Sequence, residues 1–158
     1  MDTVKNRFQA QGKFRKAASE LTAPENSGLR LILNPIDIAA ELKGDINLLL
    51  AKKWKKSRDE AKGWYASRNN FKLGEIQTVA VQSDVWVINV LVTDDKAVPL
   101  TSFDKAMKKT ADLAKSERAT VHISDLMYSM ENFEALAQKH FIDNGINVYV
   151  YTTKTTDK

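Results

Sequence analysis

The chain has 158 residues, with 24 lysines and arginines against 20 aspartates and glutamates, and it contains no cysteine. This length suits one domain that buries a core without cross-links. The lack of cysteine excludes disulfides, thiolate metal sites and cysteine nucleophiles. The net charge of +4 is only a weak indication of phosphate-bearing partners. No apolar run approaches the roughly 20 residues that span a bilayer, and the N-terminus lacks the apolar core of a signal peptide. We therefore expect a soluble, unsecreted protein in the cytoplasm.

Residues 1–28 are predicted to form an N-terminal extension. The hydrophobic residues of its first part recur at a loose helical spacing that Gly12 interrupts, which predicts a short helix or an arm. The turn-forming cluster T-A-P-E-N-S-G then serves as a linker to the domain. Residues 29–33 are almost entirely leucine and isoleucine, which predicts a buried strand that ends at Asn34-Pro35.

The next stretch predicts two helices and then two strands. Apolar residues recur at helical spacing after Gly44-Asp45, where the first helix begins, and a second helical stretch continues to about Arg68. Residues 75–82 and 84–93 then read as a pair of strands joined by a short polar turn. The second strand is too continuously apolar for an exposed edge, so we expect it inside the sheet.

Helices and strands alternate through the second half of the chain. Thr101-Ser102 is a candidate cap for a helix over 103–115, whose apolar face contains Phe103, Met107, Ala111 and Ala114. A strand over 118–124, a helix over 130–141 and a last strand over 146–152 follow. This alternation predicts an α/β domain over 29–152, with helices on both faces of its sheet, before a polar tail at 153–158.

Several segments, taken in order, resemble the macrodomain family. They are L-I-L-N-P-I-D at 31–37, K-G-D-I-N-L-L-L-A-K-K-W at 43–54, Gly74-Glu75, V-L-V-T at 90–93, E-N-F at 131–133 and V-Y-V-Y at 148–151. The chain is similar in this respect to the terminal ADP-ribose protein glycohydrolase and to the DNA ADP-ribosyl glycohydrolase antitoxins. The resemblance implies a three-layer fold, a mixed sheet flanked by helices, that binds ADP-ribose, a related nucleotide or an ADP-ribosylated macromolecule.

The resemblance also implies a ligand cleft formed by residues 34–45, 93–96 and 124–129. Two family features are missing, since the loop at 41–45 has one glycine and the loop at 124–129 has none, whereas close approach of backbone N–H groups to phosphates favours glycine. We therefore expect binding without efficient hydrolysis, and no cofactor or metal. If hydrolysis persists, Asp125 is the expected general base. The expected ligand-binding residues are Asn34, Asp37, Gly44, Asp45, Thr93, Asp94 and Ser124.

Structural explanations compete with these assignments. A Ser-Asp pair after a strand, such as Ser124-Asp125, is often a helix cap or a turn. The carboxylates of the cleft could bind a metal or a ribose hydroxyl, but acidic side chains in loops are more often simply solvated. His122 alternates with apolar residues in its strand, which favours a structural histidine, and His140 beside Lys139 is expected at the surface.

A basic helical segment gives the alternative function. Its cations alternate with Trp54, Trp64 and Tyr65, which combines phosphate neutralisation with stacking surfaces, as in nucleic-acid-binding proteins. A solvated helix face with tryptophans in the core explains the same pattern. The alternative function is thus that of a non-enzymatic interaction protein. The chain also fits a virus-encoded accessory protein. The face that would bind a protein or nucleic acid comprises Lys52, Lys53, Lys55, Lys56, Arg58 and Lys62.

Familiar catalytic fingerprints are missing from the sequence. It has no H-E-x-x-H, G-x-S-x-G, Walker or Rossmann motif, which excludes the enzymes that depend on those devices.

Overall fold

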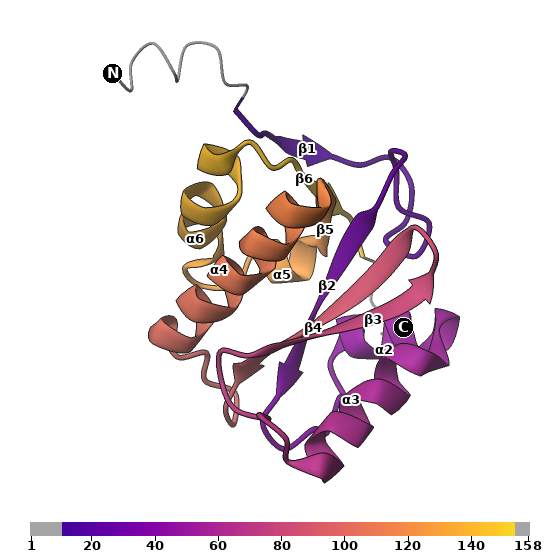
Figure 1. Ribbon diagram of the computed structural model, residues 1–158, viewed down its shortest axis with the longest axis vertical. Coiled ribbons are helices and arrows are strands. Elements are labelled where there is room, and N and C mark those ends of the chain that lie inside the picture. Colours follow the sequence, from indigo (N-terminus) through magenta and orange to yellow (C-terminus); the bar gives the residue numbers. More distant parts are fainter. Residues whose placement is uncertain (1–10, 154–158) are drawn as a thin grey trace.

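The computed structural model describes residues 11–153 of the chain. Its centre is a sheet of six strands in the order β1-β6-β5-β2-β4-β3 (Figure 1). The strands are β1 (Phe14–Lys16), β2 (Arg30–Asp37), β3 (Ile76–Gln82), β4 (Val85–Thr93), β5 (Thr120–Ser124) and β6 (Val148–Tyr151).

The directions of the strands place several chain ends at one edge of the sheet. Strand β2 pairs in parallel with β4 on one side and with β5 on the other, whereas β3 runs antiparallel to β4. The carboxyl ends of β2, β4 and β5, which are Asp37, Thr93 and Ser124, therefore lie along the same edge. Because the chain passes from one side of β2 to the other, this edge is where an open α/β sheet commonly binds its ligand.

Helices cover both faces of the sheet, and the predicted α/β mixed sheet is confirmed. Helices α2 and α3 lie on one side, and α4 and α6 lie on the other (Figure 1). Strand β4 pairs on both sides, as its apolar sequence predicted. The helical segments are α2 (Asp45–Lys53), α3 (Lys55–Ser67), α4 (Leu100–Glu117), α5 (Asp125–Tyr128) and α6 (Phe133–His140), followed by the short 3₁₀ segment η1 (Ile142–Asn144).

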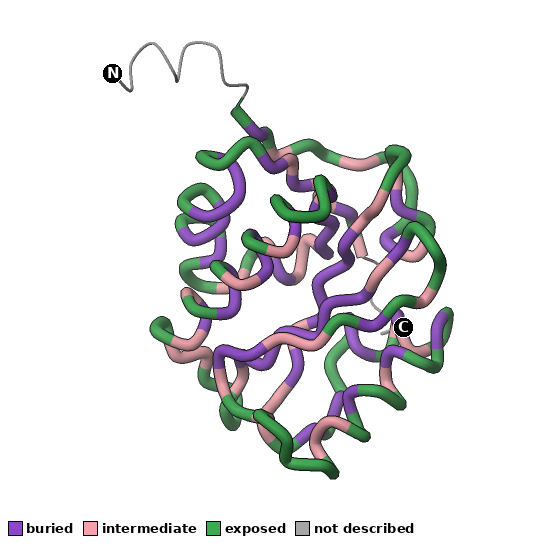
Figure 2. Tube along the Cα trace, viewed as in Figure 1, coloured by how far each residue is buried: buried purple, intermediate pink, exposed green. Residues whose placement is uncertain are grey.

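The core follows from the apolar patterns of these elements. Leu31, Ile32 and Leu33 on β2 are completely buried. The strands in the middle of the sheet are mostly buried, and the outer faces of the helices are exposed (Figure 2). The predicted apolar face of α4 is buried in the main core, and its Phe103 and Met107 have no exposed surface. A smaller cluster lies apart from the main core, under the carboxyl ends of β2 and β4, and joins them to α3. Its buried members are Ile36, Leu42, Ala61 and Leu91.

The N-terminal segment was expected to form a short helix or an arm, and a helix is wrong for its described residues. Residues 14–16 form β1, which pairs in parallel with β6, and residues 1–10 lie outside the described part of the chain. Gly12 allows this pairing, because a Cβ atom there would lie 2.1 Å from the carbonyl oxygen of Ile146. Phe14 then packs edge-on against Tyr128, with ring centroids 5.5 Å apart. Within residues 11–21, an edge strand thus takes the place of the expected helix.

Three further details differ from the sequence-based expectation. Strand β2 continues through Pro35 to Asp37; its pairing with β5 ends at Ile32, so Pro35 lies where β2 has one partner strand. Helix α4 begins after Pro99, and no side chain caps it, so Thr101-Ser102 is not the cap. A one-turn helix, α5, follows β5, and α6 begins at Phe133 rather than near residue 130.

Within residues 11–153, no helix is both long enough and apolar enough to cross a bilayer.

Candidate functional site

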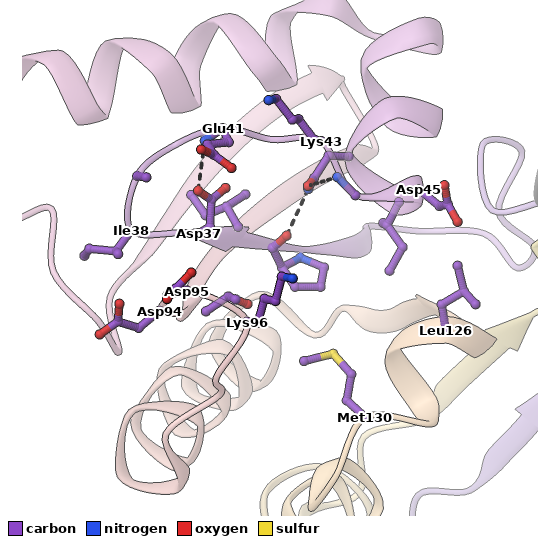
Figure 3. A pocket seen from close by; sticks show the side chains of 17 residues that line it. Asp37, Ile38, Glu41, Lys43, Asp45, Asp94, Asp95, Lys96, Leu126 and Met130 are labelled. Atoms are coloured by element: carbon purple, nitrogen blue, oxygen red, sulfur yellow. Dashed lines mark hydrogen bonds between the residues drawn. The ribbon is translucent and has the colours of Figure 1, made fainter.

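A cavity of about 720 Å³ opens at the carboxyl ends of β2 and β4. This volume lies within the range of roughly 300–1,000 Å³ that is common for small-molecule sites. Its walls come from the end of β2, from the site loop (residues 38–44), from the first turn of α2 and from the loop after β4 (Figure 3). Leu126 and Met130 close it from the segment that follows β5. The cavity therefore lies in the cleft predicted from the sequence.

Most of the predicted ligand-binding residues lie in the wall of this cavity. Asp37, Gly44, Asp45, Thr93 and Asp94 line it. Whether they bind a ligand stays a prediction.

Asp37 fixes the shape of the site loop. Its Oδ2 atom accepts a hydrogen bond from the N–H of Glu41 at 2.9 Å, and its Oδ1 atom accepts one from the N–H of Leu42 at 3.0 Å. The first of these bonds is visible in Figure 3. Ala40 and Leu42 have φ angles of 53° and 54°, in the left-handed region that favours glycine. The loop thus turns without glycine between Ile38 and Lys43, and the carboxylate of Asp37 holds the turn from within.

Asn34 does not line the cavity but belongs to a buried chain of amides. Its side chain, 3% exposed, donates to Asn89 Oδ1 at 2.8 Å and accepts from Asn47 Nδ2 at 2.7 Å. The amide of Asn47 also donates to the carbonyl of Pro35 and accepts from the N–H of Gly44. The amide of Asn89 donates to the carbonyl of Ser57 and to Gln77 Oε1. This chain fixes the first turn of α2 against β2.

Ser124 and Asp125 make the contacts of a helix cap. The hydroxyl of Ser124, a residue with no exposed surface, accepts a hydrogen bond from the N–H of Leu126 at the start of α5. Asp125 Oδ1 accepts from the N–H of Thr153 at 3.1 Å and from the hydroxyl of Ser124 at 3.3 Å. Neither residue is in the cavity wall. Their described contacts therefore tie α5 to the segment after β6.

The rest of the cavity wall combines acidic groups, two cations and apolar side chains, most of them within the predicted cleft. Only Ile46, Asn47 and Met130 lie outside the predicted cleft, and Met130 follows α5, a helix that the sequence did not predict. The additional lining residues are Ile38, Glu41, Lys43, Ile46, Asp95, Lys96, Leu126 and Met130, together with Pro35, Ile36, Ala39 and Asn47.

The start of α2 offers free donors to this cavity. Within residues 11–153, the backbone N–H groups of Lys43, Asp45 and Ile46 have no hydrogen-bond partner. The first N–H groups of a helix and its dipole together favour an anion at this position. Among the described residues, no group of three acidic or histidine side chains is arranged to hold a metal ion.

The predicted basic face does not form one continuous free surface. Lys62 Nζ donates to the carbonyl of Ala40 at 2.8 Å, and Arg58 donates to the carbonyl of Leu42 at 3.2 Å. Lys56 donates to the carbonyl of Ala80 at 3.0 Å, and Lys55 pairs with Asp59 at 3.3 Å. Lys52 and Lys53 are exposed. Several of the cations thus serve contacts within the fold, and two of them contact the site loop.

The two tryptophans among these cations also make contacts within the fold. Trp54 is 9% exposed and belongs to the core. Trp64 packs edge-on against Phe71, and its indole N–H donates to the carbonyl of Asn69. These contacts favour the explanation that the tryptophans are core residues.

The two histidines are structural. His122 is completely buried between the hydroxyls of Thr120 and Tyr151, each 2.7 Å from a ring nitrogen, as expected. Burial and the charge of Arg30 lower its pKa to about 3, so the ring is neutral at physiological pH. His140 is only 7% exposed and lies 2.7 Å from Asp104 on α4, so the expectation of a surface histidine is wrong.

Comparison with known proteins tests the fold. No protein-family model matches the sequence, and no curated protein sequence matches it either. The chain is similar in structure to a macrodomain protein from Streptomyces coelicolor, with a TM-score of 0.82 and 25% identity over 90% of this chain and 99% of the other. The chain has a macrodomain fold.

The resemblance inferred from the sequence is therefore confirmed at the level of the fold. A protein of unknown function from Bacteroides thetaiotaomicron shares the macrodomain fold of this chain, with a TM-score of 0.83 and 24% identity over 90% of this chain and 99% of that one. A Trypanosoma brucei macrodomain, whose structure was solved in complex with ADP-ribose, is more distant. Its TM-score is 0.56, with 10% identity over 87% of this chain and 63% of the other.

Proposed function

We propose that the cavity binds ADP-ribose, a related nucleotide or an ADP-ribosylated macromolecule, without efficient hydrolysis. The observation that carries this proposal is the position of the cavity in a macrodomain fold, at the carboxyl ends of β2 and β4 with the first turn of α2 in its wall. The Trypanosoma brucei macrodomain, which shares the fold, binds ADP-ribose.

The chemistry of the wall supports such a ligand. The free N–H groups at the start of α2, with Lys43 and Lys96 nearby, suit a diphosphate. The carboxylates of Asp45 and Asp94 can accept hydrogen bonds from ribose hydroxyls or from an adenine amino group. Apolar side chains, among them Ile46, give a surface for a base.

The contacts of Asp125 support the absence of efficient hydrolysis. A general base must reach the proton that it removes, either directly or through one water. The Oδ1 atom of Asp125 instead bonds to the N–H of Thr153 and the hydroxyl of Ser124, and Asp125 is not in the cavity wall. Binding without turnover is the activity that this arrangement favours.

The contacts of α3 favour the cavity over the basic helix as the binding site. A partner on the basic face would compete with the bonds that Lys56, Arg58 and Lys62 make to backbone carbonyls. A cytoplasmic location, which the lack of cysteine suits, and a viral source stay predictions.

Calorimetric titration with ADP-ribose tests the proposal. We expect micromolar binding, and a ligand concentration of 100 times Kd should stabilise the fold by about 2.7 kcal/mol, visible as a raised Tm. Asp45→Ala should weaken binding because it removes a carboxylate from the wall. Asp112→Ala, on the outer face of α4, should leave binding unchanged. No heat change at millimolar ligand would overturn the proposal.

A further inference from the structure

The site loop is held from outside the cavity by one face of α3. Arg58, Ala61 and Lys62 have the spacing i, i+3 and i+4, which places them on the same side of a helix. Ala61 and Leu42 belong to the same buried cluster, while Arg58 and Lys62 bond to the loop carbonyls. No residue of α3 lines the cavity. Two residues predicted to bind a partner thus contact the wall of the cavity from behind.

These bonds fix individual peptide groups of the site loop. The peptide that joins Ala40 to Glu41 is held at both ends, because its carbonyl accepts from Lys62 and its N–H donates to Asp37. The peptide that joins Leu42 to Lys43 is held at its carbonyl by Arg58. Its N–H, which has no partner within residues 11–153, points the opposite way, since the peptide is trans. Arg58 therefore aims the N–H of Lys43 away from α3.

The loop needs such support because of its backbone conformation. The left-handed region is unfavourable for a residue with a side chain, and both Ala40 and Leu42 occupy it. Glycine would adopt these angles without that cost. Here the conformation depends instead on burial of both side chains, each 2% exposed, and on the bonds to Asp37, Arg58 and Lys62.

We propose that Arg58 and Lys62 are positioning residues, which hold the turn of the site loop between Ile38 and Lys43 in the conformation that binds the ligand. The proposal rests on the proposed function for its ligand, ADP-ribose. It assigns these two cations to the binding site, through the loop, and not to a surface for nucleic acid or protein.

Single substitutions to methionine test this role. Lys62→Met and Arg58→Met keep most of the aliphatic chain and remove the charged donor. Lys56→Met is the matched control, since Lys56 lies on the same helix and also donates to a backbone carbonyl, that of Ala80, away from the cavity. A hydrogen bond from a charged donor is stronger than a neutral one, but the exposure of Lys62 to solvent weakens it. We therefore expect each site variant to lose roughly three- to tenfold in affinity for ADP-ribose. The control should match the wild type.

A second readout needs no ligand. Hydrogen exchange of the amides of Glu41 and Leu42, measured by NMR, should accelerate roughly three- to tenfold in Lys62→Met and stay unchanged in Lys56→Met. Lys62→Arg, which keeps a charged donor, should restore most of both the affinity and the protection. Equal losses in the three methionine variants would overturn the proposal, as would unchanged affinity and exchange in Lys62→Met.

The two readouts separate this inference from the proposed function. If the wild type fails to bind ADP-ribose while Lys62→Met speeds amide exchange, the ligand is wrong and the support of the loop stands. If the wild type binds and the variants change neither affinity nor exchange, the function stands and the positioning role is wrong.

Discussion

Replacement of Asn47 by alanine should destabilise the fold because it opens the buried chain of amides. The side chain of Asn47 makes three hydrogen bonds: to Asn34 Oδ1 at 2.7 Å, to the carbonyl of Pro35 at 2.9 Å and from the N–H of Gly44 at 3.1 Å. The bond to Gly44 should cost little when lost, because Gly44 is exposed and water can replace it. The two acceptors, the Oδ1 atom of Asn34 and the carbonyl of Pro35, both lie on β2, and Asn34 is only 3% exposed.

The expected size of the effect follows from these acceptors. A net hydrogen bond contributes about 0.5–1.5 kcal/mol, and a buried polar atom left without a partner costs about 1–3 kcal/mol. We therefore expect Asn47→Ala to lower the free energy of unfolding by about 2–4 kcal/mol, measured by urea denaturation. Asn69→Ala, at an exposed position after α3, should stay within about 0.5 kcal/mol of the wild type.

Asn47→Asp tests which groups donate and which accept in this series of buried amides. The aspartate would still accept from the N–H of Gly44, but it would place a carboxylate oxygen against the carbonyl of Pro35 and the Oδ1 atom of Asn34. Asn34 cannot adapt by turning its amide, because Asn89 is fixed by its bond to the carbonyl of Ser57, which only accepts. Asn47→Asp should thus cost at least as much as Asn47→Ala. A loss below about 1 kcal/mol in both variants would refute the reasoning.

Three other positions give predictions: substitutions at two glycines should change stability in opposite directions, and Glu75 should make stability depend on pH. Gly12→Ala should destabilise the protein by about 1–3 kcal/mol and expose the β1–β6 pairing to hydrogen exchange, because the new Cβ meets the backbone of Ile146. Gly63 lies inside α3 with open space around it, so Gly63→Ala should instead raise the free energy of unfolding by about 0.5–1 kcal/mol. If urea denaturation showed that both variants are more stable than the wild type, the predicted contact at Gly12 would be wrong. Burial of Glu75 acts to raise its pKa, but Lys105 and Lys109, at 3.0 and 3.2 Å, outweigh it and hold the pKa below its usual value of 4.5. The ionised carboxylate of Glu75 therefore stabilises the fold fully above the unfolded-state pKa, and this contribution is lost as pH falls through the lower folded-state pKa. Glu75→Gln should flatten the dependence of the free energy of unfolding on pH below about 4.5. An unchanged pH profile would refute this role.

Much of the fold could be predicted because long apolar patterns determine it. The continuous run of β4 indicated an interior strand, and the spacing of Phe103 and Met107 indicated the buried face of α4. Short elements gave weaker patterns. Strand β1 has three residues at the edge of the sheet, and its position depends on a close backbone contact at Gly12, which no periodicity reveals.

The site could be located but its contacts could not be predicted. The order of strands brings Asp37, Thr93 and Asp94 to one edge, and the sequence placed them there. Whether a side chain faces the cavity depends on partners far along the chain. Asn34 is turned inward by Asn89, which is 55 positions away, and the carboxylate of Asp125 is held by Thr153.

The distribution of left-handed residues gives a further physical reason to regard the cavity as the functional site. Among residues 11–153, several non-glycine residues with positive φ are at helix ends or are asparagines, where this conformation is common. The others are Ala40, Leu42, Asp95 and Lys96, in the two loops at the carboxyl ends of β2 and β4. The pairing of these strands is also irregular there, with a bulge between Ile36 and Asp37. Conformations of this kind cost free energy and persist where the surrounding structure supports them, as ligand sites often do. Since α3 and Asp37 hold the first loop and the hydrogen bonds between Asp94 and Ala97 close the second, the fold maintains a strained backbone in the two loops that line the cavity.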